Sequence, residues 1–155
     1  MNDLMSTNIN YGELITVKYA ADIMKLSKYI RYFENKKGSD VASDYDGKQG
    51  TSKLKFPVFD STLLTFTKEA AETSLMDPNY IYKYRKYRIM TEAEEKAAIR
   101  NAKDKDIDLL RAILSRYVLE GRYKTGTWKE GAERGIFHDV LAKLVEMYEF
   151  HNIKH

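Results

Sequence analysis

Residues 80–88 combine aromatic rings and positive charges in a spacing that could bind a nucleic acid. The stretch holds four tyrosines and four cations and no acidic residue: Tyr80, Tyr82, Lys83, Tyr84, Arg85, Lys86, Tyr87 and Arg88. Proteins bind single-stranded nucleic acids through rings that stack on bases and cations that follow the phosphates. The same composition is typical of a half-buried helix whose tyrosines pack inward while Lys and Arg reach solvent, or of a protein interface. The sequence favours the half-buried helix and leaves both binding interpretations open.

A second group of cations and rings follows further along the chain, formed by Arg111, Arg116, Arg122, Tyr123, Lys124 and Trp128. The part from Arg122 to Trp128 could hold a phosphate at a helix N-terminus, where free amides and the helix dipole favour an anion. The Gly-Lys-Ser/Thr of a phosphate-binding loop does not follow. The alternative, which we favour, is that Arg122 and Lys124 neutralise the C-terminal end of the preceding helix.

The histidines and clustered acids give only weak indications of catalysis or metal binding. His138 lies close in sequence to Glu130, Glu133 and Asp139, as a general base could, although a surface histidine at a helix start is the commoner case. His151 and His155 have the i, i+4 spacing of metal ligands but lie at the chain end. The acidic residues Asp40, Asp44 and Asp46 lack the final Glu of a calcium loop. We therefore predict no catalytic residue, no metal and no cofactor.

Composition indicates a single globular domain, expected to span residues 1–155. The chain is 43% hydrophobic and 32% charged, and its net charge of +3 is too small to argue for nucleic acid by itself. It contains no Cys, which excludes disulfides and thiolate chemistry. No apolar run approaches the roughly 18 residues of a membrane span, and residues 1–11 lack the order of a signal peptide. We expect a cytoplasmic protein without a membrane partner.

The apolar periodicity predicts an all-α bundle of about five to seven helices. The expected helices cover 11–34, 60–75, 78–90, 91–102, 104–120, 127–135 and 136–151; the third is ambiguous, because its tyrosines also alternate as in a strand. The core should come from the first helix, from Leu63–Phe66 and from the two long C-terminal helices. Residues 1–10 should be a flexible terminus, and the Gly-rich stretch 36–52 a mobile loop.

Helix ends are marked by capping signals. Thr91 with Glu94, and Thr127 with Glu130, match the capping box in which a hydroxyl and a carboxylate satisfy free amides reciprocally. Gly121 should end the helix that begins near residue 104. The helix after Thr91 is short and mostly polar, so it should lie on the surface.

Three stretches resemble an uncharacterised family of small bacterial proteins, known only as a domain of unknown function. They are Tyr29–Glu34, the aromatic lead from Phe59 to Phe66, and Leu110–Leu144 with its Arg122-Tyr123, Gly126 and Gly135. The resemblance covers about residues 28–148, apart from 36–50. It implies a helical single domain and supplies no catalytic residue.

Three hypotheses for function follow. The first is a non-enzymatic protein-binding module of a bacterium or phage, of the kind that inhibits a host system, which should expose a contiguous Tyr/Met/Trp patch; self-association would also suit it. The second is a single-stranded nucleic-acid-binding protein that uses Tyr80–Arg88. The third is a small enzyme with a site around His138, Glu130, Glu133 or Arg122.

Overall fold

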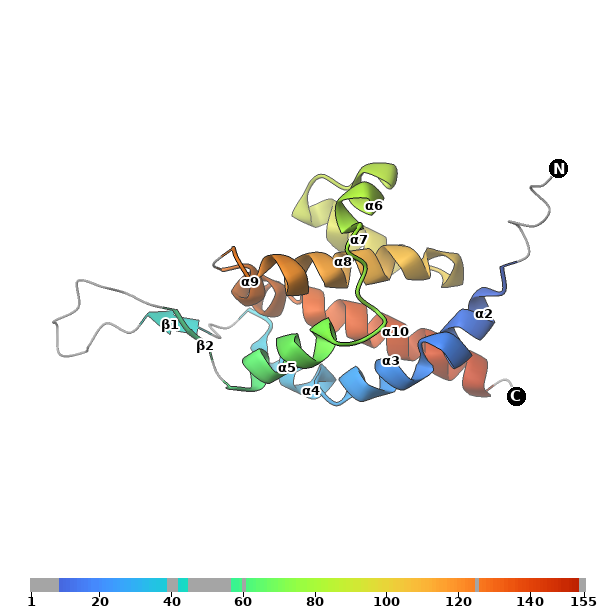
Figure 1. The fold of residues 1–155 in the computed structure, drawn as a ribbon, viewed down its shortest axis with the longest axis horizontal. Helices are drawn as coiled ribbons and strands as arrows, with labels where there is room; N and C mark the ends of the chain where they lie inside the picture. The colour runs from blue at the N-terminus through green and yellow to red at the C-terminus, as the bar shows by residue number, and fades with distance from the viewer. Residues whose placement is uncertain (1–8, 39–41, 45–56, 60, 125, 154–155) are drawn as a thin grey trace, which may run out of the picture.

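The computed structural model describes residues 9–38, 42–44, 57–59, 61–124 and 126–153. The fold is all-α, as predicted (Figure 1). The helical segments are α2 (Tyr11–Glu13), the π turn η1 (Leu14–Lys18), α3 (Ala20–Ser27), α4 (Ile30–Lys36), α5 (Ser61–Ala71), α6 (Tyr80–Lys86), α7 (Glu92–Asn101), the 3₁₀ turn η2 (Asp104–Asp106), α8 (Ile107–Glu120), α9 (Thr127–Glu133) and α10 (Ile136–Ile153). The nine α-helical segments of the described residues exceed the five to seven expected, because the first predicted helix is divided.

That first helix is interrupted twice, yet one apolar stripe runs along it. The amide of Tyr19 donates to the Leu14 carbonyl over 2.9 Å, the i→i+5 bond of a π turn. A second break at Lys28 and Tyr29 follows α3. Buried apolar residues continue across both breaks at Ile15, Tyr19, Ile23, Leu26, Tyr29 and Phe33. The second break buries Tyr29 and leaves Ile30 only half-buried, although the periodicity had placed Ile30 in the stripe.

The core forms where α8 and α10 meet the N-terminal helices and α5, as predicted. In Figure 1, α10 lies between α8 and the layer of α3, α4 and α5, while α6 and α7 cover the other side of α8. The rings of Phe33, Phe66 and Phe137 contact one another at the centre, with centroid separations of 4.7, 5.0 and 5.2 Å. Such tilted ring pairs add stability beyond their buried area.

A two-stranded antiparallel ribbon projects from the bundle in Figure 1. It pairs β1 (Ala42–Asp44) with β2 (Pro57–Phe59), with Ser43 opposite Val58. Strand β1 lies inside the stretch 36–52 that the sequence predicted as a loop; most of that stretch, like residues 1–8 of the predicted flexible terminus, lies outside the described residues.

The capping predictions were right at one helix and wrong at another. The Glu94 amide donates to Thr91 Oγ1 over 3.1 Å, and the Thr91 amide donates to Glu94 Oε1 over 3.0 Å, so the first capping box is present. At α9 the cap is Gly126, in the left-handed conformation at φ +95°, and no side chain caps the helix. Because the chain turns at Gly126, Thr127 becomes the first helical residue and cannot accept as a capping residue.

No helix among the described residues is both long enough and apolar enough to cross a membrane.

We expect Phe66→Ala to lower the free energy of unfolding by about 3–5 kcal/mol, because it empties the centre of the aromatic cluster. The neighbouring Leu64 is exposed, so Leu64→Ala should cost less than about 1 kcal/mol. Urea unfolding followed by circular dichroism measures both. Equal losses in the two variants would contradict this placement of the core.

Candidate binding surface around helix α6

Helix α6 carries most of the predicted basic-aromatic segment and is attached to α8 at its start. The buried Asp77 makes this attachment: its amide donates to Ser115 Oγ over 2.7 Å, and its carboxylate accepts from the Asn79 amide at 2.9 Å and pairs with Lys83 at 2.7 Å. Burial alone would raise the pKa of Asp77, but the hydrogen bonds from Lys83 and Asn79 outweigh it and hold that pKa below its ordinary value. Lys83 therefore has a structural role, because its charge is paired with the buried Asp77.

The four tyrosines of the segment do not share one face. Tyr80 is buried against the bundle, and Tyr84 and Tyr87 are half-buried. Only Tyr82 stands out into solvent, with 62% of its surface exposed. Three of the four rings thus contact the fold, which is the arrangement that the half-buried-helix interpretation describes.

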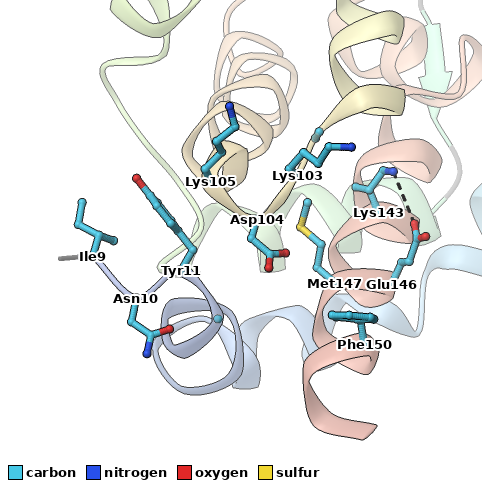
Figure 2. A pocket seen from close by; sticks show the side chains of 12 residues that line it. Ile9, Asn10, Tyr11, Lys103, Asp104, Lys105, Lys143, Glu146, Met147 and Phe150 are labelled. Atoms are coloured by element: carbon cyan, nitrogen blue, oxygen red, sulfur yellow. Dashed lines mark ion pairs between the residues drawn. The ribbon is translucent and has the colours of Figure 1, made fainter. Parts of the chain in front are cut away.

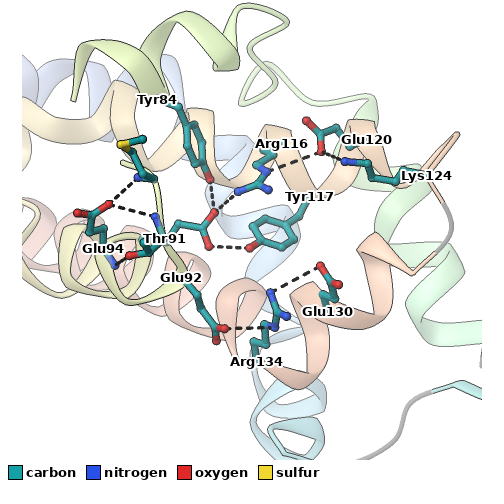
Figure 3. Close-up of polar contacts among 12 residues, drawn as sticks. Tyr84, Thr91, Glu92, Glu94, Arg116, Tyr117, Glu120, Lys124, Glu130 and Arg134 are labelled. Carbon is teal, nitrogen blue, oxygen red and sulfur yellow. Dashed lines mark hydrogen bonds and ion pairs between the residues drawn. The ribbon is translucent and has the colours of Figure 1, made fainter. Parts of the chain in front are cut away.

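A buried carboxylate joins α6, α7 and α8, and three of its neighbours, Tyr84, Arg116 and Tyr117, are labelled in Figure 3. Glu95 of α7 is only 2% exposed. Its Oε2 accepts from the Tyr84 hydroxyl at 2.7 Å and from Arg116 Nη1 at 2.5 Å, and its Oε1 accepts from the Tyr117 hydroxyl at 2.6 Å. The sequence predicted that α7 lies on the surface, and Glu95 departs from that prediction, because a carboxylate can be buried when donors satisfy both of its oxygens.

The same contacts change how the donors titrate. Burial, and then the charge and hydrogen bond of Glu95, raise the pKa of Tyr84 well above its ordinary value, and the pKa of Tyr117 is raised likewise. For Arg116, burial would lower the pKa, but Tyr84 and Glu95 outweigh burial and raise it. The network thus consists of two neutral hydroxyls, one guanidinium and one carboxylate.

An open pocket of about 530 Å³ lies beside this network. Its lining comes from α6, from the connector that follows it and from α8: Tyr80, Ile81, Tyr84, Arg85, Arg88, Ile89, Met90, Arg116 and Glu120. We call it the α6 pocket. Ile89 is buried, whereas Ile81 and Met90 are 54% and 85% exposed. Two large apolar side chains therefore flank an apolar hollow in contact with water.

The arginines of the α6 pocket differ in what they contact. Arg116 is held by Glu95 and also lies 3.7 Å from Glu120, whose carboxylate is 3.8 Å from Lys124 (Figure 3). Arg85 and Arg88 are exposed, and neither has an ion pair with a carboxylate of the described residues. The pocket therefore offers two guanidinium groups that the described fold does not neutralise.

The residues of the second predicted cluster are divided between two places. The hydroxyl of the exposed Tyr123 lies 3.4 Å from that of Tyr80, next to α6. Trp128 packs against α8 and donates from Nε1 to the Val118 carbonyl over 2.9 Å, and Arg122 lines a small pocket with it beside α5. Lys124 lies 3.8 Å from the Glu120 carboxylate near the end of α8.

Arg111, of the same cluster, fastens the segment before α6 to α8. It donates to the carbonyls of Ser74, Leu75 and Met76 at 3.1–3.3 Å and pairs with Asp108 at 2.9 Å. Its guanidinium also lies 4.8 Å from the centre of the Tyr19 ring. These contacts explain Arg111 as a structural residue.

The residues considered for catalysis contact different partners and, in the described part of the chain, do not form one cluster. His138 Nδ1 lies 3.0 Å from Asp139, and Glu130 pairs with Arg134 at 3.6 Å. Glu133 belongs to α9, while Arg122 faces α5. Of the residues considered for metals, His151 Nε2 lies 2.5 Å from Asp104. Asp40, Asp46 and His155 lie outside the described residues, and the side chain of Asp44 is not among those described.

A larger hollow of about 840 Å³, which sequence reasoning missed, lies between α2, η2 and α10 (Figure 2). Its walls come from residues 9–12, 102–105 and 143–150. Three lysines and two acids share it, and Lys143 pairs with Glu146 at 3.6 Å. No local motif could have revealed it, because its three segments are far apart in sequence. The apolar side of the α6 pocket was also missed, although Ile89 and Met90 directly follow the basic-aromatic segment.

Comparison with known proteins gives one match. The model of a family described as a family of unknown function (DUF6508) matches residues 18–150, which confirms the resemblance expected from the sequence. No curated protein and no solved structure matches the chain significantly.

Removing the charge of Glu95 should destabilise the fold. We expect Glu95→Gln to lower the free energy of unfolding by about 2–3 kcal/mol, less than for a fully buried pair because Arg116 is part-exposed. Glu92→Gln is the matched control: Glu92 pairs with Arg134 in solvent, so its loss should cost about 0–1 kcal/mol. Chemical denaturation measures both. A Glu95→Gln protein as stable as the control would refute the network.

The raised tyrosine pKa values predict a loss of stability in alkali. A tyrosine whose pKa is higher folded than unfolded stabilises the fold in its neutral form. That contribution is complete below the ordinary tyrosine pKa of about 10 and is lost as the pH rises toward the raised value. Denaturation midpoints should therefore fall above about pH 10. The fall should be shallower in Tyr84→Phe/Tyr117→Phe, and an equally steep fall would show that other groups cause it.

Proposed function

The chain belongs to DUF6508, a family of unknown function, and we propose that it is a small protein-binding module whose contact surface is the α6 pocket. The observation that carries this proposal is the exposure of Ile81 and Met90 beside an apolar hollow flanked by Arg85 and Arg88. In keeping with its resemblance to small bacterial proteins, we place the partner in the cytoplasm of a bacterium, as a protein of the cell or of its phage.

The apolar part of the surface supports a protein partner. Scattered exposed apolar side chains are ordinary, but Ile81 and Met90 line the same hollow, together with the buried Ile89 of the core. Methionine and arginine are both enriched where proteins meet, since methionine adapts its shape and arginine combines charge with a flat apolar face. Such a hollow can receive one bulky side chain of a partner.

The charged part of the surface supports selectivity. Arg85 and Arg88 line the hollow and are exposed to water. Charges at the edge of an interface chiefly accelerate encounter and reject partners of like charge. A partner with an acidic surface would thus be drawn to α6.

The arrangement of the rings gives less support to a nucleic-acid partner. Stacking on bases needs exposed ring faces in a row. Tyr84 directs its hydroxyl to Glu95 and Tyr80 is buried, so Tyr82 and Tyr123 are the rings nearby that remain free to stack. We therefore keep this function as an outcome of the test.

We expect Met90→Asp to abolish capture of the partner, because a carboxylate would stand at the edge of the apolar hollow. The measurement is affinity purification of the tagged protein from its host, with bound material identified by mass spectrometry and by absorbance. Val17→Asp is the matched control, since Val17 is an exposed apolar residue of η1, far from the α6 pocket in sequence and in its contacts. Both variants should retain the wild-type unfolding midpoint.

A stoichiometric protein that is recovered with wild type and Val17→Asp, but not with Met90→Asp, supports the proposal. Recovery with all three proteins would refute the α6 pocket as the contact surface. Recovery of nucleic acid that is released by salt would replace the proposal with the nucleic-acid function.

A further inference from the structure

Resting on the proposed function, we infer that the α6 pocket receives a partner segment that carries a carboxylate next to a bulky apolar side chain, and that Arg88 is the residue that binds the carboxylate. The inference starts from the backbone of Arg88. Its φ is +56°, and it is the only residue other than glycine with a positive φ in the described part of the chain. Side chains are strained in this left-handed region, which glycine adopts freely.

The strained backbone has a clear local cause. Helix α6 ends in a Schellman motif: the amide of Ile89 donates to the Tyr84 carbonyl over 3.0 Å, and the amide of Arg88 donates to the Arg85 carbonyl over 3.1 Å. Arg88 occupies the one position of this motif that must be left-handed, where glycine is the usual residue. For folding alone, glycine would serve at least as well as arginine.

The contacts of Arg88 within the fold do not explain why an arginine stands there. Its side chain is exposed and has no ion pair with a carboxylate of the described residues. The side chain instead lines the α6 pocket, together with Arg85 three residues earlier. Strain at a residue whose side chain has no role in the fold is typical of binding sites. We therefore assign Arg88 to the ligand.

The chemistry of the ligand follows from what surrounds the two arginines. Guanidinium groups bind carboxylates through paired, charge-assisted hydrogen bonds. Ile81, Ile89 and Met90 line the pocket beside these two arginines, so the ligand should place an apolar group next to its anion. The pocket's own acid, Glu120, is offset by Arg116 and Lys124 and does not occupy Arg85 or Arg88.

A small probe with these two features tests the inference directly. We would titrate 4-phenylbutyrate into the whole protein, follow the methyl signals of Ile81 and Met90 by NMR, and use 4-phenylbutyramide as the uncharged match. We expect Arg88→Gly to weaken 4-phenylbutyrate binding by about tenfold, as the loss of one charge-assisted contact would, and to leave the amide's weaker binding unchanged. Arg31→Gln, an exposed arginine of α4, is the control for net charge and should not change either affinity.

Stability separates a binding role from a structural one. Because glycine suits the left-handed position, Arg88→Gly should keep or raise the urea unfolding midpoint while binding falls. A lower midpoint would show that the fold holds Arg88 and would overturn the inference, as would equal affinities of wild type for the carboxylate and the amide. Displacement of 4-phenylbutyrate by millimolar inorganic phosphate would also overturn it, in favour of an anion without an apolar group.

The result for Arg88→Gly can be separated from the proposal that the protein binds a protein partner. A cellular partner whose capture needs Met90 but is indifferent to Arg88→Gly would leave the protein-binding function standing and remove the carboxylate from it.

Discussion

The packing of α6 and α7 against α8 depends on one buried carboxylate. Glu95 accepts three hydrogen bonds, from Tyr84 of α6 and from Arg116 and Tyr117 of α8. The buried Tyr117 hydroxyl and the Glu95 carboxylate would each lose more by remaining unpaired than a single hydrogen bond contributes. Glu95 thus joins α7 to α8 through two hydrogen bonds and to α6 through one. The hydrogen bond from Tyr84 to Glu95 therefore holds the inner face of α6 against the bundle while the other face stays exposed.

The same contact explains which side chains of α6 face the bundle and which face solvent. Tyr84 directs its hydroxyl to the buried Glu95, Tyr80 is buried and Lys83 pairs with Asp77, whereas Tyr82 is exposed. The apolar Ile81 and the arginines then occupy the outer side. Arg111 fastens the segment 74–76 before α6 to α8, and Tyr84 of α6 donates to Glu95, so α6 is held at two places. A surface formed in advance binds without the entropic cost of ordering itself.

Much of the fold could be predicted from local patterns, and the site could not. Spacings of three and four residues placed the long helices and the core, because burial of one helix face is a periodic signal. Gly121 follows the last residue of α8 as expected, but it is not left-handed: its φ is −65°, and glycine is needed there because a Cβ would lie 2.1 Å from the Trp128 ring. The pairing of Glu95 with Tyr84 and Tyr117 joins residues 11 and 22 positions apart, and no periodicity records such a contact. The second capping box failed because a left-handed glycine ended the turn one residue earlier than the motif implied.

The π turn near the start of the chain sets the angle at which α2 faces the rest of the bundle. An ordinary α-helix advances about 100° per residue, so one residue more or less in that turn would rotate everything before it by about that angle. Gly12 would then leave His151, which sits so close that a Cβ on Gly12 would lie 3.0 Å from its ring. Tyr11 and Gly12 also line the larger hollow, so the same rotation would remove them from its wall. Relatives of this chain that lack the extra residue would share its core and yet present a differently shaped surface at this end of the molecule.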